Sequence, residues 1–327
     1  MLAQVLDAAL DMFGNLRAKI DEVLDLDIIR EIKSLWIPYK PSHNVYMKRY
    51  SVAAIDSGFN YKEFRGYALY IQNTAWVIID AKGNEEYKGS VDIDLASTSN
   101  IEYELSLLSL AKEVEAMMRL VTEADIVLVD GSIVAMFSKL RRAVMESDHE
   151  LLSSKKINVD SALKNLLITL SLYPRKFVFL SKNSTAKDLL GFVKGDVYYF
   201  ERYTDGVPGY TKPLNLAQSK HLSIAFTAKM FSHTAKNVTG MRMHIYMSYA
   251  RLEPFSRVYR IEIVSSDDEP VEPRIRSIID VLSQHSFSGY PYPLVRADQL
   301  ARVGNADVER VATVLGIAED PYGREPI

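Results

Sequence analysis

The sequence predicts an α/β fold in which a mixed β-sheet is flanked by helices, and three features support this prediction. Strand-like segments follow one another closely over residues 50–80, a long amphipathic pattern covers residues 100–122, and a short apolar run follows at residues 124–129. The composition, 48% hydrophobic and 25% charged over 327 residues, is that of an ordinary globular protein. We expect one elaborated domain, residues 41–327, after an N-terminal helical segment, residues 1–40.

The N-terminal segment has the spacing of an amphipathic helix. Apolar residues recur at intervals of three and four over residues 2–13 and 16–24, which predicts a helix with a break near Gly14. Pro38 and Pro41 are expected to end it. We expect this helix to pack on a partner subunit as well as on the core of its own chain.

Residues 50–80 predict a three-stranded antiparallel meander. The strand candidates are residues 50–56, 66–72 and 75–80. Asn73 and Thr74 are expected to link the last two strands, and residues 82–84 to turn the chain after the third.

Residues 100–122 then predict one long helix with an apolar stripe and several glutamates around it. The apolar run 124–129 is typical of a fully buried strand in a parallel sheet, and it ends in Asp130, Gly131 and Ser132. The order of meander, helix and buried strand is that of a ribonuclease H-like domain. We therefore predict a ribonuclease H-like mixed sheet that combines the antiparallel meander with parallel strands.

The second half of the chain alternates between the two kinds of element. Helices are predicted at residues 161–172, 186–190 and 273–284 and from Ala297 onward, and strands at residues 176–180, 197–200, 244–248 and 259–264. A loop rich in glycine and proline is expected at residues 202–213, and an acidic turn at residues 265–273.

Composition excludes several classes of site and protein. Without cysteine the chain has no disulfide, no thiol nucleophile and no zinc site with thiolate ligands, which fits an intracellular, cytoplasmic protein. The N-terminus does not resemble a signal peptide, and no apolar run approaches the ~20 residues of a membrane span. A phosphate-binding G-x-x-x-x-G-K-[ST] loop is also absent, so ATP hydrolysis is not expected.

The formal net charge of −3 provides no overall attraction to nucleic acid, so DNA binding would require local clusters of lysine and arginine. Lys139, Arg141 and Arg142 form one such cluster, and Lys155 and Lys156 form another. Each cluster is also typical of a solvated helix face, which is the favoured interpretation.

Two aspartates follow apolar strand segments and precede a pair of small residues. Asp56 lies in AAIDSGFN and Asp130 in VLVDGSIV, and we expect both at the carboxyl ends of neighbouring strands. The serine–glycine pairs would let the backbone turn and leave room for a ligand. Paired carboxylates bind hard cations such as Mg²⁺ or Mn²⁺, and two such ions can catalyse phosphodiester hydrolysis. The alternative is an ordinary turn residue at the end of a strand.

A third carboxylate is expected from the long helix, but its spacing does not identify it. At about 100° per residue, Glu113 lies at one edge of the apolar stripe, while Glu104 and Glu115 lie together at the other edge.

Five motifs in order resemble those of one nuclease family. AIDSGFN, the glutamate-bearing helix, VLVDGS, FLSKNSTAKDL and GYPYPLVRADQLARV extend from Ala53 to Val303 and are similar to the successive motifs of the NurA family. The resemblance implies that Asp56 and Asp130 bind metal. It also makes Glu113 the best match to the family's helical glutamate.

The last two motifs suggest further site residues. By resemblance, Lys182 would meet the scissile phosphate. Asp298 occupies a position where many relatives have histidine, and it is expected as a further metal ligand. Tyr290 and Tyr292 are expected to stack on unpaired bases, against the alternative of simple packing.

The resemblance implies a Mn²⁺- or Mg²⁺-dependent DNA nuclease of the ribonuclease H-like class. NurA-family enzymes are archaeal, form homodimers and process DNA ends with the hexameric ATPase HerA. Membership would imply a 5′ to 3′ exonuclease on single- and double-stranded DNA, with single-strand endonuclease activity, in end resection near the nucleoid. The rivals are a non-catalytic DNA-end-binding adaptor, a ribonuclease and a junction resolvase on the same fold.

Overall fold

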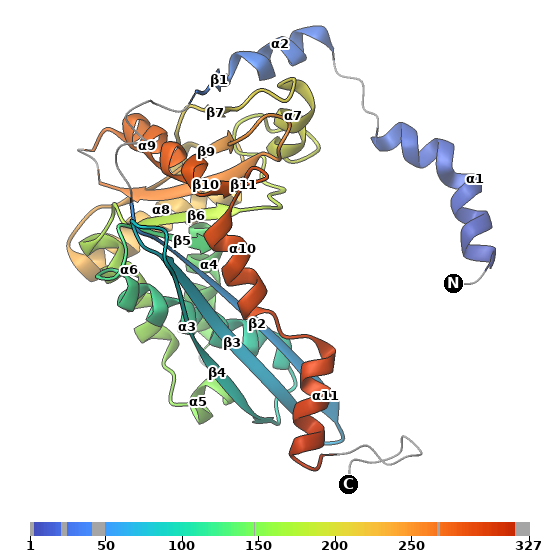
Figure 1. The fold of residues 1–327 in the computed structure, drawn as a ribbon, viewed down its shortest axis with the longest axis vertical. Helices are drawn as coiled ribbons and strands as arrows, with labels where there is room; N and C mark the ends of the chain where they lie inside the picture. Colours follow the sequence, from blue (N-terminus) through green and yellow to red (C-terminus); the bar gives the residue numbers. More distant parts are fainter. Residues whose placement is uncertain (1–2, 21–24, 41–49, 147, 267–268, 318–327) are drawn as a thin grey trace.

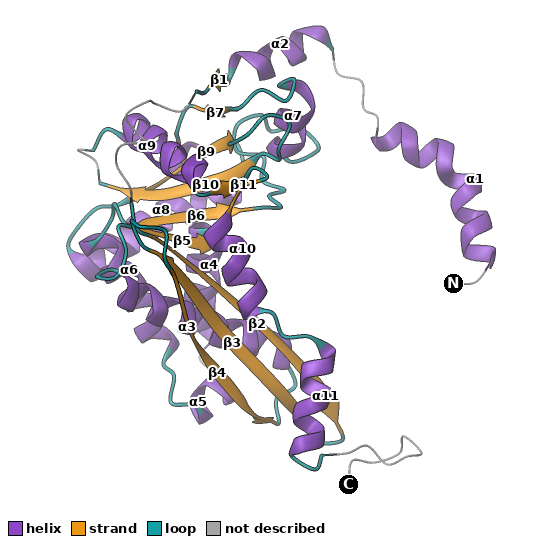
Figure 2. Ribbon diagram, in the orientation of Figure 1, coloured by secondary structure: helices purple, strands orange, loops and turns teal. Residues whose placement is uncertain are grey.

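A ten-stranded mixed sheet runs through the molecule, with helices on both faces (Figure 1). The structure is a computed structural model that describes residues 3–20, 25–40, 50–146, 148–266 and 269–317. The strand order is β1-β7-β9-β10-β6-β5-β2-β3-β4, with β8 paired to β9. Figure 2 shows the sheet between its two helical layers. Helices α3, α4, α6 and α8 pack on one face, and α9 and α10 on the other.

A three-stranded antiparallel meander forms, as predicted, but the predicted strands 66–72 and 75–80 were wrong, because they are parts of a single strand. β2 (Val52–Phe64), β3 (Tyr67–Ile79) and β4 (Glu85–Ala96) are its strands, so Asn73 and Thr74 lie inside β3 rather than in a turn. Tertiary contacts satisfy their side chains: Asn73 Nδ2 donates to the Leu300 carbonyl at 2.7 Å, and Thr74 Oγ1 bonds Ser57 Oγ at 2.9 Å. The prediction also missed β4, although its apolar residues alternate with polar ones over residues 91–95.

The central part of the fold confirms the prediction. Helix α3 (Ile101–Leu120) is followed by β5 (Ile126–Asp130), which pairs in parallel with β2 from Val52↔Ile126 to Ile55↔Val129. Helix α6 (Val159–Leu172) leads to β6 (Phe177–Ser181), which is parallel to β5. The resulting order β4-β3-β2-β5-β6 is the ribonuclease H-like arrangement that the sequence predicted.

The second half extends the sheet with antiparallel strands. β10 (Tyr259–Ser265) pairs with β6 and with β9 (His244–Arg251), and α9 (Val271–Gln284) covers them. Helix α10 (Tyr292–Ala301), which begins before the predicted Ala297, lies against β2 and β3 (Figure 1). The remaining elements are β1 (Trp36–Pro38), α5 (Glu150–Ser154), β7 (Gly209–Thr211), β8 (Leu214–Asn215), η2 (Leu216–Gln218), β11 (Ser286–Phe287), β12 (Tyr290–Pro291) and α11 (Asn305–Val314).

Other predictions in this half were wrong. Residues 186–190 form no helix, and residues 197–200 belong to helix α7 (Asp196–Tyr203) rather than to a strand. The carboxylate of Asp196 accepts hydrogen bonds from the backbone of Leu189 and Leu190, which holds that segment in an irregular conformation. Two long helices were missed, α4 (Ile133–Glu146) and α8 (Leu222–Thr239).

The N-terminal segment contains two helices, α1 (Ala3–Ile20) and α2 (Leu26–Ser34). Helix α1 continues through Gly14, so the predicted break near that residue was wrong. Pro38 lies in β1, whereas Pro41 falls outside the described residues. Within the described part of the chain, no helix combines the length and apolar character needed to span a membrane.

Candidate metal centre

Three aspartates from three elements converge where the parallel pairing of β2 and β5 ends. One carboxylate oxygen each from Asp56, Asp130 and Asp298 lies within 4.8 Å of the others. Asp56 follows directly after the last parallel pair of β2 and β5, Ile55↔Val129, and Asp130 is the last residue of β5. Asp298 comes from α10, which packs on β2. Tertiary packing therefore places three oxygen ligands where a single cation could contact all of them.

The expected strand end at Asp56 was wrong. β2 continues to Phe64, and Gly58 forms no turn. A Cβ atom on Gly58 would lie 2.5 Å from the carbonyl oxygen of Ala301, so this glycine leaves room for the C-terminal end of α10. Gly131, by contrast, does turn the chain, with φ +111°, directly after β5.

The structure brings one of the three helical glutamates to the aspartates. Glu113 is buried on α3, where burial and the charges of Asp56 and Asp130 raise its pKa to about 8, partly offset by a hydrogen bond from Ser57. Glu104 accepts hydrogen bonds from Thr98 Oγ1 and the backbone N–H of Leu151, both at 2.6 Å. Glu115 forms an ion pair with Lys112. Of the three glutamates, Glu113 is therefore the one near the aspartates, since the charges of Asp56 and Asp130 raise its pKa. Its carboxylate is not in the group of oxygens that lie within 4.8 Å of one another.

The carboxylates destabilise one another's charged forms. Burial, then the negative charge of Asp130, raises the pKa of Asp56 to about 7, against a smaller opposing effect of the Ser57 backbone N–H. Burial also raises the pKa of Asp130. Carboxylates in this arrangement favour a bound cation, and their oxygens are the ligands that Mg²⁺ and Mn²⁺ prefer. The residues present therefore fit a divalent metal.

Two cations, Arg302 and Lys182, contact the aspartates. Arg302, whose side chain is mostly exposed, lies 3.2 Å from Asp298 through its Nη2 atom. The other cation, Lys182, is more buried. Its Nζ lies 2.8 Å from Asp130 Oδ2 and 3.4 Å from Asp298 Oδ1. Burial disfavours the charged ammonium, but the hydrogen bond to Asp130 and the neighbouring carboxylates outweigh it and raise the lysine pKa. The raised carboxyl pKa values show that ionisation of the whole cluster is disfavoured, and a bound divalent cation would favour it.

The two tyrosines predicted to stack on bases are separated by the fold. The ring of Tyr290 lies 5.0 Å from Lys182 Nζ and 5.1 Å from the ring of Tyr259. Its hydroxyl is buried and bonds no other group of the described chain, and burial with the nearby carboxylates raises its pKa well above the ordinary value. Tyr292 instead donates to Glu85 at 2.9 Å, on the outer side of α10. Only Tyr290 therefore lies beside the cluster.

The chain resembles known proteins in sequence and in fold. A family model described as the NurA domain matches residues 50–303. The chain belongs to the NurA family. Among relatives named "DNA double-strand break repair nuclease NurA", that of Sulfolobus acidocaldarius is 28% identical over 300 residues, covering 87% of this chain and 85% of the relative. That of Saccharolobus solfataricus is 24% identical over 337 residues, covering 97% and 96%.

Two solved NurA structures share the fold. The NurA nuclease from Sulfolobus solfataricus has a TM-score of 0.75 at 23% identity and covers 97% of both chains. A NurA structure bound to dAMP and manganese has a TM-score of 0.56 at 12% identity, covering 100% of this chain and 99% of that chain. The NurA fold therefore extends over nearly the whole chain.

A buried ionic network that was not predicted supports the Asp130 turn. Glu262 of β10 accepts hydrogen bonds from Ser132 Oγ at 2.9 Å and from the backbone N–H of Ile133 at 2.8 Å, at the start of α4. Arg260, two residues earlier, pairs with Glu262 and contacts Asp188 at 3.0 Å. The sequence contained a signal for this network, because YRIEIVS has two charged residues in a mainly apolar strand segment. Charged side chains are seldom fully buried unless they are paired.

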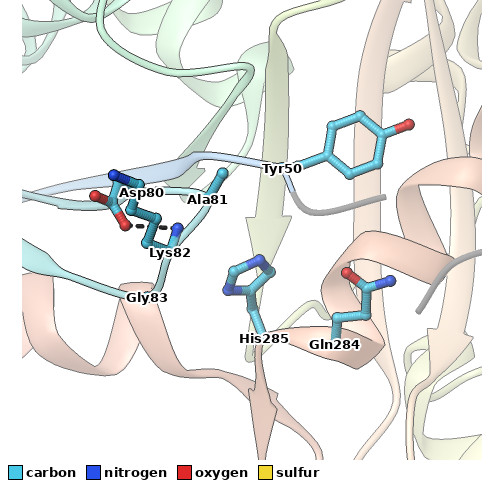
Figure 3. Close-up of a pocket in the computed structure, with 7 residues that line it drawn as sticks. All are labelled: Tyr50, Asp80, Ala81, Lys82, Gly83, Gln284 and His285. Carbon is cyan, nitrogen blue, oxygen red and sulfur yellow. Dashed lines mark hydrogen bonds between the residues drawn. The ribbon is translucent and has the colours of Figure 1, made fainter. Parts of the chain in front are cut away.

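The contacts of two of the predicted basic-cluster residues and of one pocket near Asp80 are explained without a ligand. Lys155 is held by Asp92 and Asp94, both at 2.7 Å, and Arg142 by Glu146 at 2.6 Å, so these cations of the predicted basic clusters are already paired. A pocket of about 310 Å³ beside Asp80 lies at the opposite end of the parallel strands (Figure 3). Asp80 bonds the turn at residues 82–84, which explains its presence there without a metal.

Proposed function

We propose that this chain is a metal-dependent DNA nuclease that hydrolyses phosphodiester bonds at the carboxylate cluster. The observation that carries the proposal is the convergence of Asp56, Asp130 and Asp298 within 4.8 Å. Buried Glu113 lies beside them. The family relatives are named DNA repair nucleases, and one NurA structure holds manganese and a nucleotide, dAMP. These names agree with the chemistry of the site.

Asp56, Glu113, Asp130 and Asp298 would hold Mn²⁺ or Mg²⁺. A divalent cation so bound supplies Lewis acidity toward phosphate oxygens and lowers the pKa of a water molecule. The aspartates orient the reacting groups, and the low exposure of Glu113 keeps bulk water from that side. Aspartate at position 298 ligates through oxygen, which suits a hard cation.

Lys182 would bind the substrate phosphate. Its side chain is 30% exposed, so the ammonium can exchange a carboxylate contact for a phosphate oxygen. Tyr290 would position a base beside the cluster, and its ring already contacts the ammonium of Lys182. Tyr292 has no part in this proposal.

We further propose a 5′ to 3′ exonuclease on single- and double-stranded DNA, with endonuclease activity on single strands, that resects DNA ends for recombinational repair inside the cell. The family membership is the support for this polarity and role. A homodimer would work with a HerA-like hexameric ATPase. Exposed apolar residues on α1, namely Leu6, Leu10 and Phe13, support protein contacts by an N-terminal segment, residues 1–40, that is separate from the nuclease domain, residues 41–327.

The test is a substrate panel. Labelled single-stranded DNA, duplex DNA, RNA and a four-way junction are each incubated with Mn²⁺, Mg²⁺ or EDTA, and end-labelled products are resolved by length. We expect DNA cleavage only with metal and shortening from 5′ ends. Cleavage in EDTA would overturn the metal mechanism, and selective cleavage of RNA or of the junction would overturn the substrate. Asp56→Ala provides the matched control for contaminating nucleases.

A further inference from the structure

The charges of this chain are unevenly distributed along its sequence. Residues 206–252 contain no aspartate or glutamate, although the whole chain has 42 acidic residues and a net charge of −3. The same segment contains six lysines and arginines, namely Lys212, Lys220, Lys229, Lys236, Arg242 and Arg251. Arg251 is buried and bonds backbone carbonyls, which leaves five cations on the surface. Such segregation in an acidic protein indicates a surface for an anion.

Three of these cations surround one pocket. It has a volume of about 310 Å³ and lies between α8 and the start of β9. Its lining consists of Ala217, Lys229, Ser232, His233, Lys236, Arg242 and His244. Lys229, Lys236 and Arg242 pair with no carboxylate in the described part of the chain, whereas other exposed lysines, such as Lys33 and Lys88, do. The pocket therefore has positive charge that no described carboxylate neutralises.

The pocket is separate from the carboxylate cluster. Helix α8 buries one face, formed by Ala225, Ala228, Phe231 and Ala235. At 100° per residue, Lys229 and Lys236 flank this face on one side, and Ser223 and Thr227 flank it on the other. The latter two line a different cavity, of about 430 Å³, together with Ser132 and Ser181 near the Asp130 turn. An anion in the basic pocket would thus bind on the far flank of α8.

We propose that this basic pocket binds the phosphate backbone of DNA away from the scissile bond. Lysine, arginine and serine are common phosphate contacts, and they position a duplex without reading its sequence. Lys229 and Lys236 are seven residues apart on α8, about 10 Å along its axis, so they would meet different phosphates of one backbone. Ala217 is the single apolar residue in the lining, which favours a polyanion over a protein surface with an apolar core. The choice of DNA rests on the proposed function.

The experiment measures binding of a fluorescein-labelled duplex by anisotropy in EDTA, at several salt concentrations. The variant Lys229→Gln/Lys236→Gln removes two charges from the pocket. Its matched control, Lys33→Gln/Lys88→Gln, removes two charges from exposed lysines that are already paired. A charge-keeping variant, Lys229→Arg/Lys236→Arg, checks that changes at these positions are tolerated, and thermal melting checks the fold of each.

We expect the pocket variant to bind at least about tenfold more weakly at 0.1 M salt, with a salt slope reduced by about 1.8. The paired-lysine control and the arginine variant should behave like the parent. An unchanged dependence of DNA affinity on salt would overturn the proposal, and is the result expected if the pocket binds an acidic protein instead. Equal losses of DNA affinity in the pocket variant and the paired-lysine control would also overturn it. Because binding is measured without metal, it is independent of cleavage. If the chain binds DNA through this pocket but cleaves no substrate, the proposed nuclease function is refuted and the proposed binding site is not.

Discussion

The two strand aspartates of the carboxylate cluster lie in nearly the same local sequence but in different backbone settings. Ile-Asp-Ser-Gly lies inside β2, which continues to Phe64, and its glycine leaves room for the backbone of α10. Val-Asp-Gly-Ser ends β5, where Gly131 turns the chain and Glu262 holds Ser132 and the first turn of α4.

This difference shows what brings the carboxylates together. The parallel pairing of β2 and β5 ends at Ile55↔Val129, so the next residue of each strand is an aspartate without a neighbour in that ladder. The site therefore forms where the pairing of β2 with β5 ends, although β2 itself continues to Phe64. Five experiments test whether the two aspartates have the same role in these different settings.

The largest effect is expected from removing either carboxylate. Asp56→Ala and Asp130→Ala should each lower Mn²⁺-dependent DNA cleavage about a thousandfold, because a bound metal stabilises the transition state by several kcal/mol. Single-turnover cleavage measures the loss, and binding in EDTA should largely survive. Asp160→Ala, which removes an exposed partner of Lys164, is the control. Loss of cleavage in only one of the two variants would contradict the inference that both strand aspartates hold the metal.

The helical glutamate that serves both aspartates is tested next. Glu113→Gln should reduce cleavage about a hundredfold, the scale of losses seen on changing groups around a metal. Glu115→Gln, two residues along the same helix, removes an exposed ion pair and should change the rate less than twofold. Equal effects of the two substitutions would refute the assignment of Glu113.

Glu262 holds the turn after Asp130, whereas Asp56 lies within strand β2. Glu262→Gln should weaken Mn²⁺ binding, measured by calorimetry, and cleavage about tenfold, because the Asp130 turn loses its anionic acceptor. Glu104→Gln is the matched control, since Glu104 is also buried and also accepts from a hydroxyl and a backbone N–H, but away from the cluster. If both variants lose stability alone, with metal binding intact, Glu262 has no positioning role.

Substitution of the two glycines that follow the aspartates should reduce folding stability for different reasons. Gly58→Ala and Gly131→Ala are each expected to cost about 1–3 kcal/mol of unfolding free energy, the first by overpacking against Ala301 and the second by strain at φ +111°. Amide hydrogen exchange distinguishes them. Protection in α10 should fall in the Gly58 variant and stay near the parent value in the Gly131 variant; the reverse would contradict the two backbone roles.

The smallest effect concerns pH. Burial and neighbouring carboxylates raise the pKa of Asp56 to about 7 and of Glu113 to about 8, whereas both groups titrate near pH 4 in the unfolded chain. The folded state therefore holds these protons more tightly, and the resulting stability is complete below about pH 4 and is lost as pH rises to about 8. Without metal, the melting temperature should fall by a few degrees over that range. Mn²⁺ should raise it more at pH 8 than at pH 5, and Glu113→Gln should flatten the pH dependence.

Much of the fold could be predicted because local patterns and packing agree in its centre. The periodicity of α3 and the apolar run of β5 are strong signals, and the antiparallel meander was recognised although its boundaries were wrong. Helix α8 was missed because small and polar residues interrupt its apolar face. Residues 197–200 were assigned to a strand because a short apolar run does not distinguish a strand from a buried helix.

The α/β class, the order of the central elements, the family motifs and the two aspartates beside apolar strand segments could be identified from the sequence alone. These properties depend on residue type and on neighbours along the chain. The packing of α3 on the sheet selected Glu113, because helix spacing leaves both edges of α3 open until it packs. The packing of α10 on β2 placed Asp298, which only the family resemblance had indicated, beside Asp56 and Asp130. Tertiary structure also decided that Gly58 serves a helix contact and that Glu262 holds the Asp130 turn, since both contacts join segments far apart in the chain.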